Sequence, residues 1–186
     1  MTVGERGILI IDHGNFEKEF LGAIANSITR EYQLPVSVKE SHFDLSEFYD
    51  PMRRQYNGNK LMAELDSWST LKHIKNIGLF RVDLFNPILT YIFGQAALNG
   101  NIGVASLYRL RNEQYGMKKD EGLLLERFQK VIIHELGHMF GLVHCHFPPC
   151  VMRSSTYVED IDQKSLHLCS KCRKEMEKTD SPTLPE

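Results

Sequence analysis

Hydrophobic residues in the first 40 positions alternate between strand-like and helix-like spacing. The aliphatic run from Gly7 to Asp12 is followed by Gly14 and predicts a buried strand. From Phe16 to Tyr32, apolar side chains recur at every third or fourth position opposite a polar face, which predicts a helix. Pro35 then precedes a second predicted strand, Val36 to Lys39. Because strand–helix–strand crossovers are right-handed units of a parallel sheet, we expect these two strands to be parallel.

The next stretch carries turn signals before the pattern of helix and strand resumes. Asp50-Pro51 and Asn57-Gly58 are turn dipeptides within an irregular region. They precede a predicted helix from Lys60 to Leu71 and a third predicted strand from Asn76 to Phe85.

Two further apolar runs surround a strong turn sequence. Tyr91 to Leu98 and Ile102 to Leu110 flank Asn99-Gly100-Asn101, so the pair predicts a hairpin. The span from Arg111 to Gly122 is polar, and we expect it to be a mobile surface loop.

The strongest helical pattern lies between Leu123 and Phe140, and Gly141 is placed to end it. Its apolar stripe consists of Leu125, Phe128, Ile132, Leu136 and Met139. A last helix is predicted from about Asp162 to Lys178, and residues 179–186 are expected to form a flexible tail.

Together these elements predict a mixed α/β (α+β) fold built on a twisted, mostly parallel sheet. A chain of 186 residues is long enough to bury one sizeable core. We therefore expect one domain over residues 1–178, with the tail outside it.

Composition and charge narrow the class of partner. The chain is 42% apolar and 25% charged, with a net charge of −2 and no block of like charges, which argues against a nucleic-acid or membrane surface. The aliphatic run from Ile8 to Ile11 is too short for a membrane span or a signal-peptide core. We expect a cytoplasmic, monomeric protein.

The first candidate for chemistry is the sequence His134-Glu135-Leu136-Gly137-His138, near the end of the strongest predicted helix. Histidines four residues apart project from one face of a helix, so both rings can bind one metal ion. Glu135 then lies beside the ion, where its carboxylate can take a proton from a zinc-bound water. The alternative is a surface helix that carries these residues by chance.

His144 is the candidate third ligand. A continuous helix would carry it away from the first two histidines, but Gly141 can adopt a left-handed conformation that ends the helix and turns the chain back. Three histidines leave a fourth zinc position for water or substrate, which is typical of catalytic zinc. The added glycine and histidine at fixed spacing favour a zinc site over the chance helix.

All the cysteines follow His144: Cys145, Cys150, Cys169 and Cys172. Two close pairs, one of them Cys-x-x-Cys, are typical of thiolates that share a structural zinc in a reducing compartment. Such a site would join the C-terminal helix to the segment that leaves His144. Two disulfides or four free thiols are the alternatives.

The arrangement resembles the metzincin metalloproteases and, more narrowly, the archaemetzincins. The residues that carry the resemblance are the histidine motif, His144-Cys145, Cys150-Val151-Met152 and Cys169-Ser170-Lys171-Cys172, within about a fifth of the chain. The resemblance implies a zincin-like fold with an active-site helix and a C-terminal helix. It also implies a structural zinc in the segment 145–172 and a turn beneath the histidines that carries Met152, here called the Met-turn.

We therefore predict a zinc metallopeptidase with two zinc ions per chain. His134, His138 and His144 would hold the catalytic ion, the four cysteines the structural one, and Glu135 would be the general base for hydrolysis of a peptide or protein substrate. A zinc-dependent peptide-binding or scaffold protein without turnover, and a hydrolase of a non-peptide amide, are the alternatives. The intact Glu135 favours hydrolysis.

By analogy with metzincins, the strand from Tyr91 to Leu98 is the candidate edge that pairs with an extended peptide, the alternative being a plain hairpin strand. Tyr157 follows the Met-turn and could polarise a substrate carbonyl, although a structural role is favoured. His146 and His167 lie near the cysteines and could in principle replace a thiolate ligand, but we interpret both as surface residues. Three further histidines have no patterned partners and are assigned no role: His13, His42 and His73.

Overall fold

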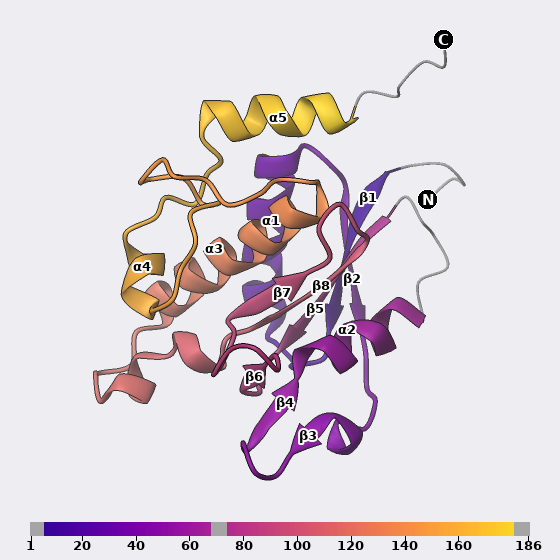
Figure 1. The fold of residues 1–186 in the computed structure, drawn as a ribbon, viewed down its shortest axis with the longest axis vertical. Helices are drawn as coiled ribbons and strands as arrows, with labels where there is room; N and C mark the ends of the chain where they lie inside the picture. The colour runs from indigo at the N-terminus through magenta and orange to yellow at the C-terminus, as the bar shows by residue number, and fades with distance from the viewer. Residues whose placement is uncertain (1–5, 68–73, 181–186) are drawn as a thin grey trace.

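The computed structural model describes residues 6–67 and 74–180, and its centre is a five-stranded sheet (Figure 1). The strand order is β2-β1-β5-β8-β7. The strands are β1 (Gly7–Asp12), β2 (Val36–Glu40), β5 (Ile74–Phe80), β7 (Gly94–Ala96) and β8 (Ile102–Ser106). The first four in this order are parallel, and β7 runs antiparallel to β8 at one edge. The predicted mostly parallel sheet and the predicted hairpin are thus confirmed.

A second, small sheet contains β3 (Tyr49–Asp50), β4 (Gln55–Asn57) and β6 (Leu84–Phe85). The prediction of one strand from Asn76 to Phe85 is wrong, because this segment divides between the two sheets. Asp83, which is buried at the break, accepts hydrogen bonds from Arg109 and Gln55. Its backbone oxygen also accepts from the amide of Tyr56. These contacts turn the chain from β5 into β6.

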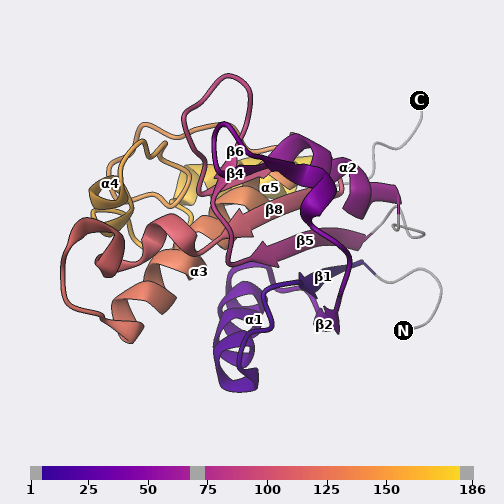
Figure 2. The same ribbon diagram turned by 90° about the horizontal axis from the view of Figure 1, so that it is seen from below.

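Helices cover both faces of the main sheet (Figure 2). Helices α1 (Lys18–Tyr32) and α3 (Glu121–Met139) pack on one face, and α2 (Gly58–Ser67) packs on the other. Side chains of a strand alternate between faces, so Ile8 and Ile10 join the α1–α3 core while Ile11 joins the α2 core. The residues 68–71 of the predicted second helix, and His73, lie outside the described part of the chain.

Short 3-10 helices occupy several connections: η1 (Ser46–Phe48), η2 (Tyr108–Leu110) and η3 (Asn112–Tyr115). The polar span from Arg111 to Gly122 therefore contains η3 and the start of α3, and is not wholly a loop as predicted. Gly116 ends η3 with a φ of 72°, and the Asp120 side chain accepts from the amide of Leu123 to begin α3.

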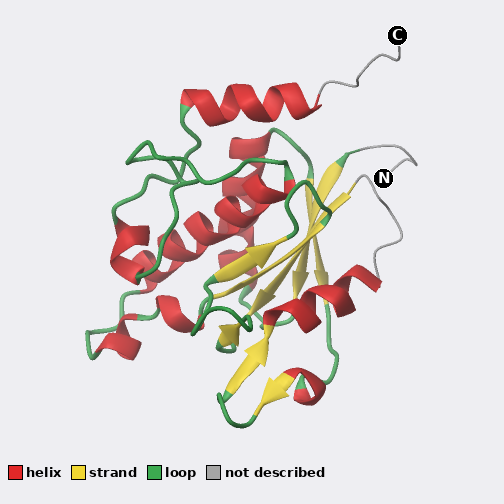
Figure 3. Ribbon diagram, in the orientation of Figure 1, coloured by secondary structure: helices red, strands yellow, loops and turns green. Residues whose placement is uncertain are grey.

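The predicted C-terminal helix from Asp162 to Lys178 is present as α5 (Ser170–Asp180) in its second half only, and the prediction is wrong for residues 163–169. Two helices, α4 (Val158–Asp162) and α5, are separated by a loop (Figure 3). Backbone groups of that loop pair with the segment near the Met-turn: His167 O accepts from Val151 N, and Ser165 N donates to Pro149 O. Residues 181–186 of the predicted tail lie outside the described residues. Within the described ranges, no helix is long and apolar enough to cross a membrane.

Candidate metal centres

The last turns of α3 bring His134 and His138 together, with their Nε2 atoms 3.1 Å apart. His134 Nδ1 lies 2.9 Å from the backbone oxygen of Val151, and His138 Nδ1 lies 2.8 Å from that of Leu142. Because a carbonyl oxygen can only accept, Nδ1 carries the proton in each neutral ring. Each Nε2 lone pair is therefore free to bind a metal.

Gly141 ends the helix and returns the chain toward these two rings. Its φ is 87°, and its amide donates to His138 O while Leu142 N donates to Gly137 O. The ring of His144 then lies 5.3 Å from that of His134 and 5.0 Å from that of His138, centroid to centroid. One nitrogen of each ring falls within 4.8 Å of the others, as predicted for a three-histidine site.

The three imidazoles fit zinc in distance and in charge. Zinc–nitrogen bonds of about 2.0–2.1 Å in a tetrahedral site place two ligand nitrogens about 3.3 Å apart. Burial lowers the pKa of His134, His138 and His144, and the charge of Lys164 lowers all three further. Neutral rings can donate their lone pairs without first losing a proton, so the site is ready for a metal.

Glu135 lies beside the triad, and its side chain is packed against the edge strand. A Cβ placed on Gly94 would lie 2.7 Å from Glu135 Cγ and 2.9 Å from its Oε1, so a larger residue would displace the carboxyl group. Glu135 is 7% exposed, and burial raises its pKa to about 8, against the opposing charge of Lys164. A glycine on β7 thus makes room for the predicted general base.

Met152 is buried under the same helix. A Cβ on Gly137, the glycine between the two helix histidines, would overlap Met152 Sδ. The turn that carries Met152 is closed by Arg153 N, which donates to Cys150 O. It is joined to the preceding segment, which leaves His144, by Cys145 N, which donates to Met152 O. The close approach of Met152 to α3 therefore depends on a glycine that the zinc motif itself contains.

A cleft of about 420 Å³ runs along the triad. Its walls come from residues 89–96, from α3 and from residues 154–156, and Tyr91 Oη donates to Thr156 O. The candidate edge strand lines this cleft, although β7 spans only Gly94–Ala96. Tyr157 is 64% exposed and is absent from the described lining residues. A hollow of about 550 Å³ between residues 141–147 and the start of α5 shares only His144 with the cleft.

Lys164 also lines the cleft, and sequence reasoning missed it. It lies in the loop after α4 and is 6% exposed. No motif marks a lysine at this position, because its contacts are with residues of the Met-turn, more than ten positions away.

The four cysteine sulfurs form a second cluster. Cys145 Sγ lies 3.8 Å from Cys169 Sγ, and Cys150 Sγ lies 3.7 Å from Cys172 Sγ, with all four atoms within 4.8 Å of one another. A disulfide requires about 2.05 Å, whereas zinc–sulfur bonds of about 2.3 Å in a tetrahedron place sulfurs about 3.8 Å apart. The cluster fits a structural zinc and does not fit the alternative of two disulfides.

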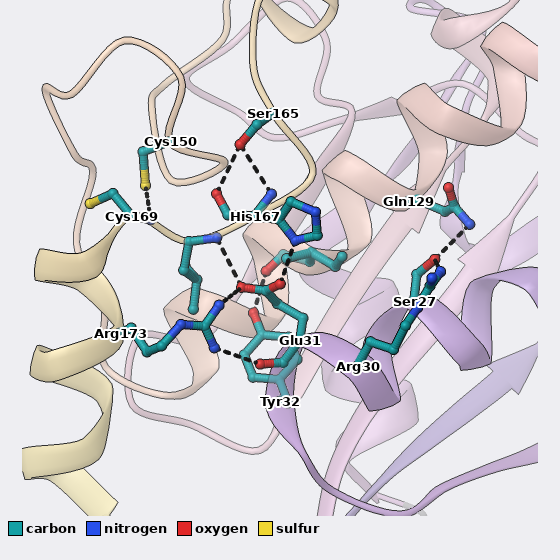
Figure 4. A network of polar contacts seen from close by, with 12 residues as sticks. Ser27, Arg30, Glu31, Tyr32, Gln129, Cys150, Ser165, His167, Cys169 and Arg173 are labelled. Atoms are coloured by element: carbon teal, nitrogen blue, oxygen red, sulfur yellow. Dashed lines mark hydrogen bonds and ion pairs between the residues drawn. The ribbon is translucent and has the colours of Figure 1, made fainter.

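A separate polar network around Glu31, here called the Glu31 network, ties residues 145–172, here called the cysteine segment, to the rest of the fold (Figure 4). Glu31, near the end of α1 and 3% exposed, accepts hydrogen bonds from Arg173, from the His167 ring and from the amide of Leu168. Arg173 also donates to Glu31 O. His167 is exposed as predicted but holds this buried carboxylate. Helix α5 is therefore joined to α1 by contacts that need no metal.

Comparisons with known proteins agree with this geometry. A family model described as peptidase family M54 matches residues 9–178, which include both clusters. An archaemetzincin of Thermococcus kodakarensis is 34% identical over 178 residues, covering 92% of this chain and 95% of that protein. The structure of a zinc-dependent peptidase from Methanocorpusculum labreanum has a TM-score of 0.83 at 27% identity, covering 91% of this chain and 100% of that one. An archaemetzincin structure from Methanopyrus kandleri has a TM-score of 0.81 at 30% identity, covering 95% and 96%.

Proposed function

The chain belongs to peptidase family M54, the archaemetzincins, and is a zinc metallopeptidase; from this premise we propose that it cleaves peptide bonds with Glu135 as the general base. One observation carries the proposal. The Glu135 carboxyl group is buried in the cleft, against Gly94 of the edge strand and next in sequence to the first zinc ligand. A carboxylate in this position can reach a water that approaches the triad.

The edge strand supplies a binding surface for an extended peptide. Ser106 N donates to Phe93 O and Ala97 N donates to Ile102 O, so residues 93, 95 and 97 bond to β8 in the alternating antiparallel pattern. The amide and carbonyl groups of Gly94 and Ala96 then point away from β8, toward the open edge. A substrate strand can pair with these groups, and its bonds would hold the scissile bond near Glu135.

A zinc ion held by His134, His138 and His144 would act as a Lewis acid, polarising a carbonyl and lowering the pKa of a water molecule to about 7. The Glu135 carboxylate accepts a proton from the attacking water as its oxygen bonds to the carbonyl carbon. Glu135 then returns that proton to the leaving nitrogen as the carbon–nitrogen bond breaks. Burial raises the pKa of Glu135, and the positive charge of a bound zinc ion would oppose that shift and favour the carboxylate form that accepts the proton.

Glu135→Gln tests this assignment, because the amide keeps the size of the side chain but cannot accept the proton. We expect turnover of a peptide library to fall by about 100-fold or more, with two zinc ions retained by elemental analysis. Glu121→Gln is the matched control, since Glu121 lies on the same helix, is exposed and should not affect turnover.

Unchanged turnover in Glu135→Gln would remove Glu135 from the mechanism. Peptide binding by a wild-type protein that shows no more cleavage than Glu135→Gln would instead support the zinc-dependent binding function. The two outcomes are separated by measuring cleavage and peptide affinity on the same samples.

A further inference from the structure

Lys164 is a buried ammonium group at the wall of the zinc cleft, and among the described residues no carboxylate oxygen forms an ion pair with it within 4.0 Å, although the charges of Glu135 and Asp160 act on it from farther away. The other buried basic side chains of the described part do have such partners: Arg127 pairs with Asp162, and Lys130 pairs with Glu126. Burying an unpaired ammonium group is unfavourable unless its hydrogen bonds compensate. We therefore expect the hydrogen bonds of the Lys164 ammonium group to compensate for its burial and to have a structural or functional role.

Those contacts are with the Met-turn. Lys164 Nζ donates to the backbone oxygen of Val151 at 3.1 Å and to that of Arg153 at 2.6 Å, so the lysine bridges the residues on either side of Met152. The oxygen of Val151 is also the one that holds His134 Nδ1 at 2.9 Å. One carbonyl thus receives both the lysine and the first zinc-binding ring.

We propose that Lys164 is a positioning residue of the peptidase site: it fixes the Val151 carbonyl, and through that carbonyl the imidazole of His134, above the Met-turn. This inference rests on the proposed function for its kinetic consequence only. A partner that orients a metal-binding histidine typically changes metal affinity or activity 10–100-fold when it is removed, because the ring then samples other orientations. An ammonium group on a long side chain has three donors and can bridge two carbonyl oxygens.

Glu135, Asp160, Cys150 and Lys130 all act on Lys164 through their charges, and two of these groups matter for a competing role. Cys150 precedes Val151, so the lysine could serve the cysteine cluster instead of the histidine triad. Glu135 also faces Lys164, and its charge opposes the effect of burial, which lowers the pKa of Lys164 to about 8. The experiment must therefore report on the histidine site separately from the cysteine cluster.

Lys164→Met removes the ammonium group and keeps the length of the chain. Zinc would be left in the cysteine cluster while Co²⁺ replaces zinc in the more labile histidine site, so that the visible absorption reports the coordination of the triad alone. We expect the Co²⁺ spectrum to differ from wild type, and kcat of the zinc form to fall about 10–100-fold with KM within about twofold. Lys164→Arg keeps the charge and several donors, and should restore both readouts in part.

Lys130→Met is the matched control, because it removes another buried lysine, which bonds to Glu126 and lies outside the described cleft lining. The charge of Lys130 acts on Lys164, but the Lys130 ammonium group is not the donor to Val151 O or Arg153 O. The Co²⁺ spectrum and kcat of this variant should match wild type. A wild-type spectrum and kcat in Lys164→Met would overturn the inference. So would loss of the cysteine-bound zinc in both Lys164 variants, which would assign the lysine to the cysteine cluster. The spectrum decides the inference even if the wild-type protein cleaves no peptide, so failure of the proposed function is a distinguishable result.

Discussion

The histidine triad and the cysteine cluster each bring metal ligands together, but the ligands come from different kinds of local structure. Two of the three histidines come from α3, whose buried side chains belong to the main core. The four cysteines come from a loop and from the start of α5. Metal binding is coupled to folding where the ligands lack another scaffold. The comparison therefore indicates that the catalytic ion occupies a preformed site, while the structural ion helps to form its own.

The cysteine segment is nevertheless held by more than its metal. Val151, Met152, Ile161 and Leu168 are buried in the same core as α3. The Glu31 network also joins the segment to α1. The metal at the thiolate site, the buried core residues and the Glu31 network thus all stabilise the position of the C-terminal helix. Variants at each of these can separate their contributions to the free energy of unfolding.

Removing a ligand of the histidine triad should give the largest difference between the effect on activity and the effect on stability. We expect His138→Ala to lose the catalytic ion and lower activity more than about 100-fold, beyond the usual range for residues that only orient a ligand. Its melting temperature should change by no more than about 2–4 °C, because α3 keeps its core contacts and loses about one hydrogen bond. Zinc analysis, peptide cleavage and thermal unfolding measure the three quantities.

A large fall in the melting temperature of His138→Ala would break the comparison. It would mean that the triad, like the cysteine cluster, needs its ion for local folding. Retention of two zinc ions by this variant would likewise exclude His138 as a ligand.

The second largest effect is expected at the cysteine cluster. Cys172→Ser should lower the melting temperature by about 10 °C, since part of the roughly 10 kcal/mol of a structural zinc site is lost and each kcal/mol is worth about 2–4 °C in a domain of this size. Activity should also fall, because Cys145 no longer anchors its neighbour His144. A melting temperature equal to wild type, with one zinc lost, would show that the core and the Glu31 network suffice.

Sequence reasoning identified the elements with long, regular patterns and the ligands with fixed spacing. The helix over α3, the parallel pairing of β1 and β2, and the turn at Gly141 were all local or motif-based inferences. Prediction from the sequence failed where contacts between distant segments determine the backbone conformation. The loop between α4 and α5 carries a helical pattern, yet its backbone groups pair with the Met-turn region instead.

The residues that support the two metal sites could not be predicted from the sequence for the same reason. Glu31 and Lys164 are charged residues with no motif, and each acts on a segment far away in the sequence. Gly94 was within the candidate edge strand, but its contact with Glu135 depends on how β7 lies over α3. Side-chain contacts between distant elements cannot be derived from spacing along one element.

A third prediction separates the contribution of the Glu31 network to stability from that of the zinc ion in the cysteine cluster. Glu31→Gln keeps the shape of the side chain but replaces a buried carboxylate that accepts from Arg173, His167 and Leu168 N. We expect a loss of about 2 kcal/mol, typical of a charged hydrogen-bonding partner, or roughly 5 °C, with both zinc ions retained. Glu17→Gln is the control: its ion pair with Arg81 is exposed and should be worth less than about 1 kcal/mol.

If Glu31→Gln instead destabilised the protein as much as Cys172→Ser, the network would be as important as the ion for the C-terminal helix. Loss of the thiolate-bound zinc in Glu31→Gln would show that the two are not independent. Differential scanning calorimetry with zinc analysis distinguishes these outcomes.

The smallest effect, and the one whose sign is informative, concerns Gly137. In an ordinary helix, alanine in place of glycine is more favourable by about 1 kcal/mol. We expect Gly22→Ala on α1 to show this gain, since among the described residues nothing beyond the adjoining residues and the nearby helix backbone lies within 4 Å of an added Cβ there. At Gly137 the added Cβ overlaps Met152 Sδ, and Met152 is fully buried, so its side chain would have to shift within the packed core.

Overpacking of a core costs about 1–3 kcal/mol, which exceeds the gain in helix propensity. Gly137→Ala should therefore lower the melting temperature by about 2–4 °C while Gly22→Ala raises it. Because Met152 must move beneath the rings of His134 and His138, activity should fall in Gly137→Ala and not in Gly22→Ala. If the Gly137→Ala protein were stabilised and fully active, Met152 would be able to move without a loss of folding free energy. The histidine site would then be less rigidly preformed than the comparison with the cysteine cluster implies.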